Sequence, residues 1–261
     1  MQAQLISSLT RREIAGRYRG SALGMLWSLL TPLFMLAVYT FVFGYVMQSR
    51  WLIPGTEMAE HSTAEFAVIL FAGLLVFQYF AEVVSQAPSL ILRNSSYVKK
   101  IVFPIEILPV VSAGAALFHA AISLLVLLAF RFAVFGSIPL TTLLAPVVFA
   151  PFLVMVLGLG WFLAALGVYF RDIAQIVAPI ITASMFLSPI FFPRSALPEW
   201  LQPWLILNPL TVPVEAFRNV VMFGVQPDWA LLGYYALAAL AVAVLGEQFF
   251  QTTRRGFADV L

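Results

Sequence analysis

The sequence contains no cysteine and very little charge. Without cysteine among its 261 residues, the chain cannot form disulfide bonds, Cys-ligated zinc sites or a thiol nucleophile. Charged residues make up 10% of the chain and hydrophobic residues 62%. An average soluble domain has roughly 25% charged and about 45–50% apolar residues. The composition therefore excludes a water-soluble enzyme or nucleic-acid binder and predicts an integral membrane protein, whose net charge of +2 implies no polybasic nucleic-acid surface.

Catalytic and metal-binding motifs are also missing. The sequence has neither an HExxH nor a GxSxG motif, and its two histidines, His61 and His119, lack any ligand spacing. A P-loop needs a glycine directly before a lysine, whereas the only lysines, Lys99 and Lys100, follow Val98 and each other. We therefore expect no catalytic residue, no metal site and no cofactor bound by this chain. If the protein uses ATP, a separate chain must hydrolyse it.

Long apolar runs dominate what remains. A helix needs about 20 predominantly apolar residues to cross a bilayer, and lipid leaves open segments no other way to satisfy their backbone. We expect an all-α integral membrane protein with six transmembrane helices in a single domain. The expected spans lie at about 23–47, 66–84, 107–130, 143–167, 173–192 and 229–250.

The segment 193–224 does not fit a span, because it contains five prolines and only short apolar pieces. Apolar pieces of about 10–14 residues are more often re-entrant or interfacial than spanning. We expect two short re-entrant helices here, at about 199–207 and 214–223, between spans five and six. An ordinary extracytoplasmic loop is the alternative.

Basic residues predict the orientation. Ten of the 14 lie in the segments 1–22, 86–105, 170–172 and 251–261, which six spans would place on one side. By the positive-inside rule both termini are then cytoplasmic. The first span is too long for a cleaved signal and no small-residue cleavage site follows it. Residues 1–22 are expected to form an amphipathic interface helix with Leu5, Ile6 and Leu9 facing lipid.

Ionisable residues inside a membrane are the usual functional candidates, but here they are few, which argues against ion-coupled transport. His119 lies in mid-span and is expected to be an interhelical hydrogen-bond partner, with a proton relay as the alternative. The others are expected near helix ends, in structural roles: Glu82, Glu106, Arg131 and Glu247.

Three glycines at four-residue spacing precede the first span. Gly16, Gly20 and Gly24 form a small-residue stripe that would let a second backbone approach closely. Helix packing is the expected role, and a contact with a second copy of the chain is the alternative.

Four stretches carry a family resemblance. They are RREI at 11–14 with RYRGSALGMLW at 17–27, NSSYVKKIVFP at 94–104 with EILP at 106–109, RDI at 171–173, and SP, LP and NPL with Glu215 and Arg218 between 188 and 218. Their order and spacing across the whole chain resemble those of type-2 ABC transporter permeases that export polysaccharides. The resemblance is greatest to the Wzm-type O-antigen permeases, with capsule and teichoic-acid permeases as sister branches.

The resemblance implies a multi-pass permease of the bacterial inner membrane, surrounded by membrane lipids. It implies a homodimer bound to two copies of a cytoplasmic ATP-binding cassette subunit, which would hold the ATP and Mg²⁺. The expected substrate is a lipid-linked glycan, most specifically an O-antigen. The alternatives are an exporter of the same family for capsule, teichoic acid, drugs or lipids, and a channel outside the family.

The resemblance also implies roles for two segments. Residues that would couple the permease to the ATPase are Asn94, Ser96, Tyr97, Lys99, Lys100 and Phe103 in the loop 94–104, together with Arg171 and Asp172. The block 193–224 would form periplasmic gate helices, with Pro198, Trp200, Asn208, Pro209, Glu215 and Arg218 as its candidate residues. The remaining tail, 251–261, would be cytoplasmic.

Aromatic and arginine side chains give the last two candidate sets. Aromatic faces stack on other flat apolar surfaces, which favours a channel wall for sugar rings at Trp27, Phe34, Tyr39, Phe43 and Phe186. Interfacial and lipid-facing packing is the alternative. Arginine pairs bidentately with phosphate, which makes Arg17, Arg19 and Arg93 candidates for the lipid pyrophosphate; setting the topology is their alternative role.

Overall fold

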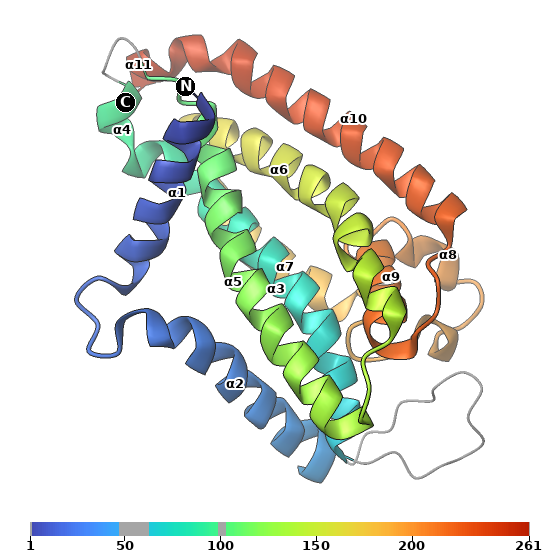
Figure 1. The fold of residues 1–261 in the computed structure, drawn as a ribbon. Helices are drawn as coiled ribbons and strands as arrows, with labels where there is room; N and C mark the ends of the chain where they lie inside the picture. Colours follow the sequence, from blue (N-terminus) through green and yellow to red (C-terminus); the bar gives the residue numbers. More distant parts are fainter. Residues whose placement is uncertain (1, 47–62, 99–102, 261) are drawn as a thin grey trace.

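The computed structural model describes residues 2–46, 63–98 and 103–260, which form a bundle of helices with no strand among them (Figure 1). The expected all-α architecture is confirmed for this part of the chain. Its α-helices are α1 (Gln2–Tyr18), α2 (Trp27–Tyr39), α3 (Thr63–Arg93), α4 (Ser95–Val98), α5 (Ile107–Phe135), α6 (Ala145–Tyr169), α7 (Ile173–Phe186), α8 (Gln202–Leu205), α9 (Thr211–Arg218), α10 (Trp229–Thr253) and α11 (Phe257–Val260). The π-helical turns η2 (Thr40–Val46) and η5 (Asn219–Phe223) continue α2 and α9, and the 3₁₀ turns η1 (Gly24–Leu26) and η3 (Leu140–Leu144) precede α2 and α6.

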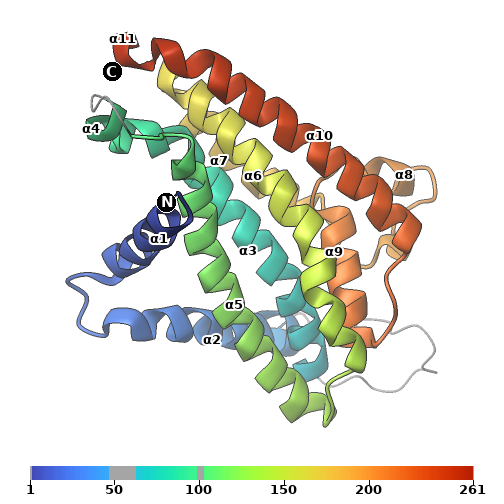
Figure 2. The ribbon, with the colours of Figure 1, turned by 45° about the horizontal axis from the view of Figure 1, so that its top comes forward.

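Helix α3 is the centre of the bundle. In its most apolar stretch 78% of the residues are buried inside the protein, compared with 11% in Gly24–Phe43. It packs against α5, α6, α7 and α9, while α10 lies outside α6 (Figure 2). A helix that is hydrophobic on all sides is stable only where protein or lipid surrounds it. The sequence of α3 therefore suits an inner position in a membrane bundle.

Five stretches of the described chain are long and apolar enough to cross a membrane: Gly24–Phe43, Ala64–Arg93, Ile107–Phe135, Leu140–Tyr169 and Trp229–Gly256. They correspond to five of the six expected spans. The remaining one, expected at 173–192, is shorter than predicted because α7 ends at Phe186 after 14 residues. At 1.5 Å per residue α7 is about 21 Å long, less than the roughly 30 Å of a hydrocarbon core. The helix ends here because Pro189 follows two residues after Leu187. A proline disfavours the helical conformation of the residue before it, here Ser188.

The proline-rich segment is less helical than expected. Of the helix predicted at 199–207, only the four residues of α8 form. The helix predicted at 214–223 begins earlier, as α9, and continues through η5 to Phe223. Pro198 opens a turn, as its carbonyl accepts from the Leu201 amide at 2.9 Å.

Helix α1 lies along α5 instead of presenting its apolar face to lipid. Leu9 shares a small pocket with Leu90, Leu108 and Val111, so the expectation that Leu9 faces lipid is wrong. The chain then turns into α2 through Gly20 and Gly24, whose φ angles of +86° and +51° favour glycine. A Cβ on Gly16, Gly20 or Gly24 would meet nothing within 4 Å, so the expected packing of this stripe does not occur within the described chain.

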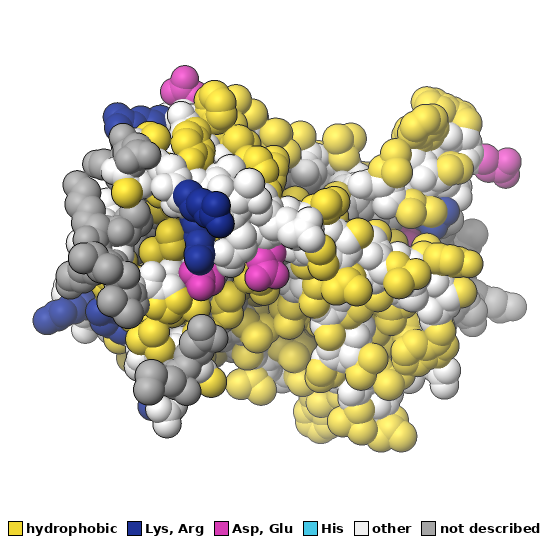
Figure 3. All heavy atoms as spheres, turned by 90° about the horizontal axis from the view of Figure 1, so that it is seen from above, with side chains coloured by type: hydrophobic (Ala, Val, Ile, Leu, Met, Phe, Trp, Pro, Cys, Tyr) yellow, Lys and Arg dark blue, Asp and Glu magenta, His cyan; other side chains and the backbone are white. Residues whose placement is uncertain are grey.

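Two apolar cores hold the bundle together. The larger surrounds α3, and the smaller joins the ends of α3, α6 and α10. Both termini lie at the end of the bundle that holds the smaller core, next to α4 and α11 (Figure 1). We refer to it as the terminal end. Seen from above, most of the Arg side chains in view lie toward this end, and hydrophobic side chains cover much of the remaining surface on this face (Figure 3).

The close approach of α6 and α10 depends on glycine. A Cβ on Gly158 would lie 2.6 Å from Cα and 2.7 Å from N of Ala243, and one on Gly246 would overlap the carbonyl of Gly158. Two helices can approach this closely only where small residues face each other, a common device in membrane proteins. The contact between α6 and α10 was not predicted from the sequence, which suggested small-residue packing only at Gly16, Gly20 and Gly24.

We expect Gly246→Ala to destabilise the protein, because the added methyl group forces two backbones apart. Overpacking of this kind costs roughly 1–3 kcal/mol. Gly233→Ala on the same helix is the matched control, since nothing lies within 4 Å of its Cβ and alanine favours helix. Thermal unfolding of the purified protein should show a lower Tm for Gly246→Ala alone. Equal Tm values for the two variants would contradict the close α6–α10 contact.

Candidate functional site

Three charged or titratable side chains from three helices meet inside the bundle. Arg17 of α1 forms an ion pair with Glu82 of α3, and Nδ1 of His119 of α5 lies 2.9 Å from the same carboxylate oxygen. His119 Nδ1 is also 3.1 Å from Nη1 of Arg17. We call these three residues the charge cluster. The charge cluster joins α1 to α3 through Glu82 and to α5 through His119.

The charge cluster partly corrects the expectations from sequence. Glu82 lies 11 residues before the end of α3, so its expected place near a helix end is wrong. The expected role of His119 as an interhelical hydrogen-bond partner is confirmed by its contact with Glu82. Arg17, a candidate for lipid phosphate, has its charge already balanced by Glu82. Sequence reasoning missed the cluster because the three residues are 65 and 37 positions apart.

A cavity of about 300 Å³ adjoins the cluster between α1, α2, α3 and α5. We call it the polar cavity, because eight of the eleven side chains that line it carry polar groups. Its lining consists of Arg17, Tyr18, Ser28, Thr31, Pro32, Met35, Gln78, Ala81, Glu82, His119 and Ser123.

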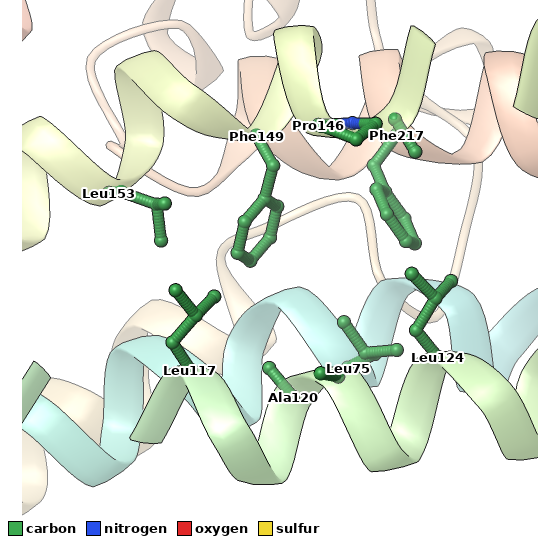
Figure 4. A pocket seen from close by; sticks show the side chains of 10 residues that line it. Leu75, Leu117, Ala120, Leu124, Pro146, Phe149, Leu153 and Phe217 are labelled. Atoms are coloured by element: carbon green, nitrogen blue, oxygen red, sulfur yellow. The ribbon is translucent and has the colours of Figure 1, made fainter. Parts of the chain in front are cut away.

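A second cavity, of about 240 Å³, has the opposite character. Its ten lining side chains are all apolar. Leu117 and Leu124 of α5 face Phe149 and Leu153 of α6 across it, with Phe217 of α9 at one end (Figure 4). Such a cavity can hold a hydrocarbon chain but gives a sugar or a phosphate no hydrogen-bond partner.

The expected ATPase-coupling residues lie at the terminal end. Tyr97 of α4 stacks on Phe103, with ring centroids 4.3 Å apart, and its hydroxyl accepts a hydrogen bond from Arg12 of α1. Asn94 donates to the Leu90 carbonyl at 2.9 Å, and Ser96 is exposed. Lys99 and Lys100 lie outside the described residues.

The second coupling segment lies near the first in space. Arg171 and Asp172 are exposed, just after the end of α6, and Tyr169 donates a hydrogen bond of 2.7 Å to the Thr253 carbonyl of α10. Tyr97 and Phe103 pack against the same small core as the ends of α6 and α10. The fold therefore gathers at one end two segments that are more than 60 residues apart in the chain.

The five aromatic candidates divide between two faces. Tyr39, Phe43, Phe191 and Phe186 form a row of ring contacts, with centroids 6.4, 5.6 and 5.6 Å apart in that order. Phe191 was not among the candidates. Trp27 and Phe34 belong to the exposed side of α2, with 45% and 66% of their surface accessible. The structure thus brings Tyr39, Phe43 and Phe186 together and leaves Trp27 and Phe34 apart from them.

Asn208 and Tyr235 hold the segment that was expected to form the gate helices against the bundle. The Asn208 side-chain amide donates to the carbonyls of Ser184 and Leu187 at 3.1 Å each, and Tyr235 donates to the Pro209 carbonyl at 2.9 Å. Trp200, by contrast, is 72% exposed. The segment is therefore anchored at Asn208 and Pro209 and exposed at Trp200.

Arg218 is the most buried of the candidate residues, with 3% of its surface accessible. Its guanidinium donates to the carbonyls of Ile69, Pro189 and Ile190 at 3.3, 2.8 and 3.1 Å. These carbonyls belong to α3 and to the turn that follows α7, so one side chain connects three separate parts of the fold. Burial lowers the pKa of Arg218 to about 10, opposed by the nearby Glu215 carboxylate.

For Glu215, too, burial and neighbouring charges shift the pKa in opposite directions. Burial raises the pKa of its carboxyl group, while the positive charges of Arg194 and Arg218 act to lower it. Arg131 lies four residues before the end of α5, as expected, and its structural role is to donate from a buried position to the carbonyls of Val221 and Met222 at 3.1 and 3.2 Å. Arg131 of α5 thus binds carbonyls within η5, and Arg218 of α9 binds carbonyls of α3 and of the turn after α7. Both arginines hold the α9–η5 segment in place.

The two other phosphate candidates are exposed. Among the described residues, Arg93 makes one long contact of 3.5 Å with the Gln86 carbonyl, and Arg19 lies in the turn between α1 and α2. The described residues include no group of three or more His, Asp or Glu side chains that could hold a metal ion.

Comparison with known proteins gives consistent similarities. Residues 4–222 match the family model described as "ABC-2 type transporter". The chain is 32% identical to the O-antigen export system permease protein RfbA of Myxococcus xanthus over 260 residues, which cover 98% of this chain and 94% of that protein. It is 25% identical to a protein of the same name from Klebsiella pneumoniae, over 98% of this chain and 95% of that protein. It is 26% identical to the polysialic acid transport protein KpsM of Escherichia coli, over 97% and 94%.

We expect Arg218→Met to destabilise the fold strongly, since it leaves three buried carbonyls without their charged donor. A buried polar group without a partner costs roughly 1–3 kcal/mol, so we expect a loss of about 2 kcal/mol or more in thermal unfolding. Arg255→Met, at an exposed position of the same chain, should have little effect. If the two variants unfold at the same temperature, Arg218 does not hold these segments together.

Proposed function

Because the chain belongs to the ABC-2 type transporter family, we propose that it is the permease subunit of an ATP-driven polysaccharide exporter. Its substrate is a lipid-linked polysaccharide, with an O-antigen as the first candidate, crossing the bacterial inner membrane. The relatives named as O-antigen export permeases, which align along almost the whole chain, support this choice. A capsular polysaccharide is the second candidate, supported by the likeness to the polysialic acid transport protein.

The observation that carries the proposal is the aromatic surface that α2 and η2 leave uncovered. Trp27, Phe34, Phe41 and Tyr45 are 45%, 66%, 62% and 70% exposed. A second copy of the chain placed against this face encloses a passage with aromatic walls, so the channel forms at the interface of a homodimer. Stacking on aromatic faces does not demand one hydroxyl pattern, which lets a polymer of sugars slide instead of being trapped.

The row of Tyr39, Phe43, Phe191 and Phe186 supports this wall from behind. It connects the first span to the end of α7, and Phe186 is 59% exposed at its far end. In this arrangement Phe34 and Phe186 contact glycan, while Tyr39 and Phe43 fix the position of the wall.

Energy enters through a separate ATPase, two copies of which bind the dimer and carry the ATP and Mg²⁺. The docking surface is α4 with the adjoining loop to Phe103, supplemented by Arg171 and Asp172. Helix α1 connects the docking surface to the charge cluster. Its Arg12 donates a hydrogen bond to Tyr97 of α4, and its Arg17 pairs with Glu82 of α3. When ATP closes the partner subunits, α1 moves with α4 as a rigid element and displaces the channel entrance.

The permease crosses the membrane six times, with both termini in the cytoplasm. Helix α7 and the residues that follow it to Phe192 make the crossing that α7 is too short to make alone. The α8–α9 segment, held by Asn208 and Arg218, is the periplasmic gate. Arg19 and Arg93 are the arginines free to attract the lipid phosphate, because Arg17 is paired with Glu82.

The docking surface gives a direct prediction. Replacing Tyr97, Lys99 and Lys100 together by alanine should abolish co-purification of the ATPase subunit, because the triple variant removes the stack on Phe103 and two positive charges. Arg255→Ala, an exposed change at the same end, should leave the complex intact. If the triple variant still binds the ATPase and its hydrolysis remains coupled to export, the docking assignment is wrong.

Export itself tests the proposed function. A strain that lacks the gene should carry no surface glycan and should accumulate lipid-linked glycan inside, and the intact chain should restore export. We expect the double variant Phe34→Ala/Phe186→Ala to restore several-fold less, since two exposed stacking surfaces are lost. Surface glycan is measured per molecule of permease in the membrane.

Phe132→Ala is the matched control, because Phe132 of α5 is 59% exposed, like Phe186, but lies outside the proposed wall. It should export normally. Full export by the double variant would disprove the aromatic wall, and surface glycan that persists in the deletion strain would disprove the proposed function.

A further inference from the structure

The polar cavity is costly for a membrane protein to maintain without a ligand. Its lining carries polar side chains such as Ser28, Gln78 and Ser123, which belong to three stretches long and apolar enough to cross a membrane. Polar groups in a membrane interior are expensive and usually functional. The apolar cavity on the other side of α5 shows that this bundle also forms a cavity without any polar group. The polar lining is therefore a specific property of one site.

The charges of this site cancel. Arg17 and Glu82 form an ion pair, and no other carboxylate, lysine or arginine lines the cavity. The guanidinium of Arg17 is engaged with a carboxylate, so a phosphate would have to compete with Glu82 for it and would meet the negative charge of that group. A neutral ligand meets no such repulsion.

His119 supplies a free hydrogen-bonding atom inside the cluster. With Nδ1 directed at Glu82, the imidazole has its other nitrogen, Nε2, buried and without a hydrogen-bond partner among the described residues. When Nδ1 carries the proton of a neutral ring, Nε2 is an acceptor. A buried acceptor without a partner costs free energy. Because Nε2 has almost no accessible surface, a ligand hydroxyl in the cavity reaches it and removes that cost only when the imidazole tilts toward the cavity.

Hydroxyl and amide groups around His119 remain available as well. Ser28 donates to the Met25 carbonyl at 2.7 Å and also has a side-chain hydrogen bond with Tyr18, so it lines the cavity as a hydroxyl that is already positioned. Gln78 and Ser123 make no side-chain hydrogen bond within the described part of the chain. The cavity lining therefore offers both donors and acceptors, as a ring with several hydroxyl groups requires.

Size and position also fit. The volume of about 300 Å³ lies at the lower end of the roughly 300–1,000 Å³ of small-molecule sites, enough for a single sugar ring and too little for a chain of them. Glu82 is about 16 Å from the end of α3, from 11 residues at 1.5 Å each. The cavity lies between the terminal end and the middle of the bundle.

We propose that the polar cavity binds one neutral pyranose unit, held by His119, Glu82, Ser28, Gln78 and Ser123. This inference rests on the proposed function and adds to it a recognition site apart from the aromatic wall. The unit enters from the side of Arg17, whose side chain is 51% exposed. The site recognises hydroxyl groups in a fixed arrangement, whereas the aromatic wall accepts many arrangements.

His119 itself can report on binding, because the chain has only two histidines. In a His61→Gln variant, ¹⁵N-labelled at histidine and reconstituted as the full-length permease in nanodiscs without a histidine tag, every imidazole signal comes from His119. The probes are neutral octyl pyranosides with glucose, galactose and mannose head groups, added below their micellar concentration. Octyl phosphate and 1-octanol serve as anionic and chain-only controls.

We expect a pyranoside to shift the Nε2 resonance saturably as that nitrogen gains a hydrogen bond, with no comparable shift from octyl phosphate or octanol. Ser123→Ala should weaken the apparent affinity roughly two- to tenfold, as the loss of one hydrogen bond predicts. Ser112→Ala is the matched control, since Ser112 lies on the same helix and is equally buried at 6% exposure but does not line the cavity.

Three results would overturn the site: no pyranoside shifts the resonance, octanol shifts it equally, or only octyl phosphate does. None of these measurements depends on export. Export without pyranoside binding would remove this site and leave the proposed function in place. Pyranoside binding in a protein that exports no glycan would keep this site and remove the proposed function.

Discussion

Polar groups inside a bilayer must find their hydrogen-bond partners within the protein, because no water is present to provide them. The described structure meets this constraint at a few positions. Arg218 serves three carbonyls, Arg131 serves two, and Asn208 serves two more. The Ile69 carbonyl lies within α3, and the other carbonyls lie at or beside the end of a helix or in a turn. The short helices and π-helical turns near the prolines are therefore stable because buried side chains replace the backbone bonds that regular helices would have made.

The same constraint explains why a chain with so few charges places several of them inside. A buried ion pair is a poor source of stability by itself, because removing two charges from water costs about as much as their attraction returns. The charge cluster instead specifies position. Arg17 and Glu82 fix the end of α1 against α3, and His119 adds α5. With Arg12 at Tyr97, α1 is held at two points, one next to the proposed ATPase dock and one beside the polar cavity.

Burial is unevenly distributed over the helices. Helix α3 is enclosed, while α2 and α10 are largely uncovered by their own chain. Lipid explains an uncovered aliphatic face, and α10 carries one. The uncovered face of α2 and η2 is instead rich in aromatic rings, and in the proposed homodimer a second copy covers this face. Where tight contact is needed inside one chain, as between α6 and α10, the protein uses glycine, and the resulting interface leaves no space for a ligand.

Sequence and structure contributed different parts of this picture. Composition and charge-free length predict the membrane class and five of the spans, because the apolar length that a bilayer requires is a property of the chain alone. The order and spacing of motifs along the chain carry the family resemblance. Periodicity could not show that α7 stops at Phe186. That end depends on Pro189, on the bonds of Asn208 to the carbonyls of Ser184 and Leu187, and on the bonds of Arg218 to the turn that follows α7.

The early glycine stripe and the row from Trp27 to Phe43 show the same limit. Spacing shows that residues share a helix, but the neighbours of that helix decide which side is covered. Glu82 is the clearest case: by sequence it is one acid near the end of an apolar run. Only folding brings Arg17 and His119 to it across 65 and 37 residues and encloses a cavity beside them. The sequence by itself determined that this chain lies in a membrane and carries family motifs; its tertiary structure decided which polar groups meet, because those contacts join residues that no local pattern connects.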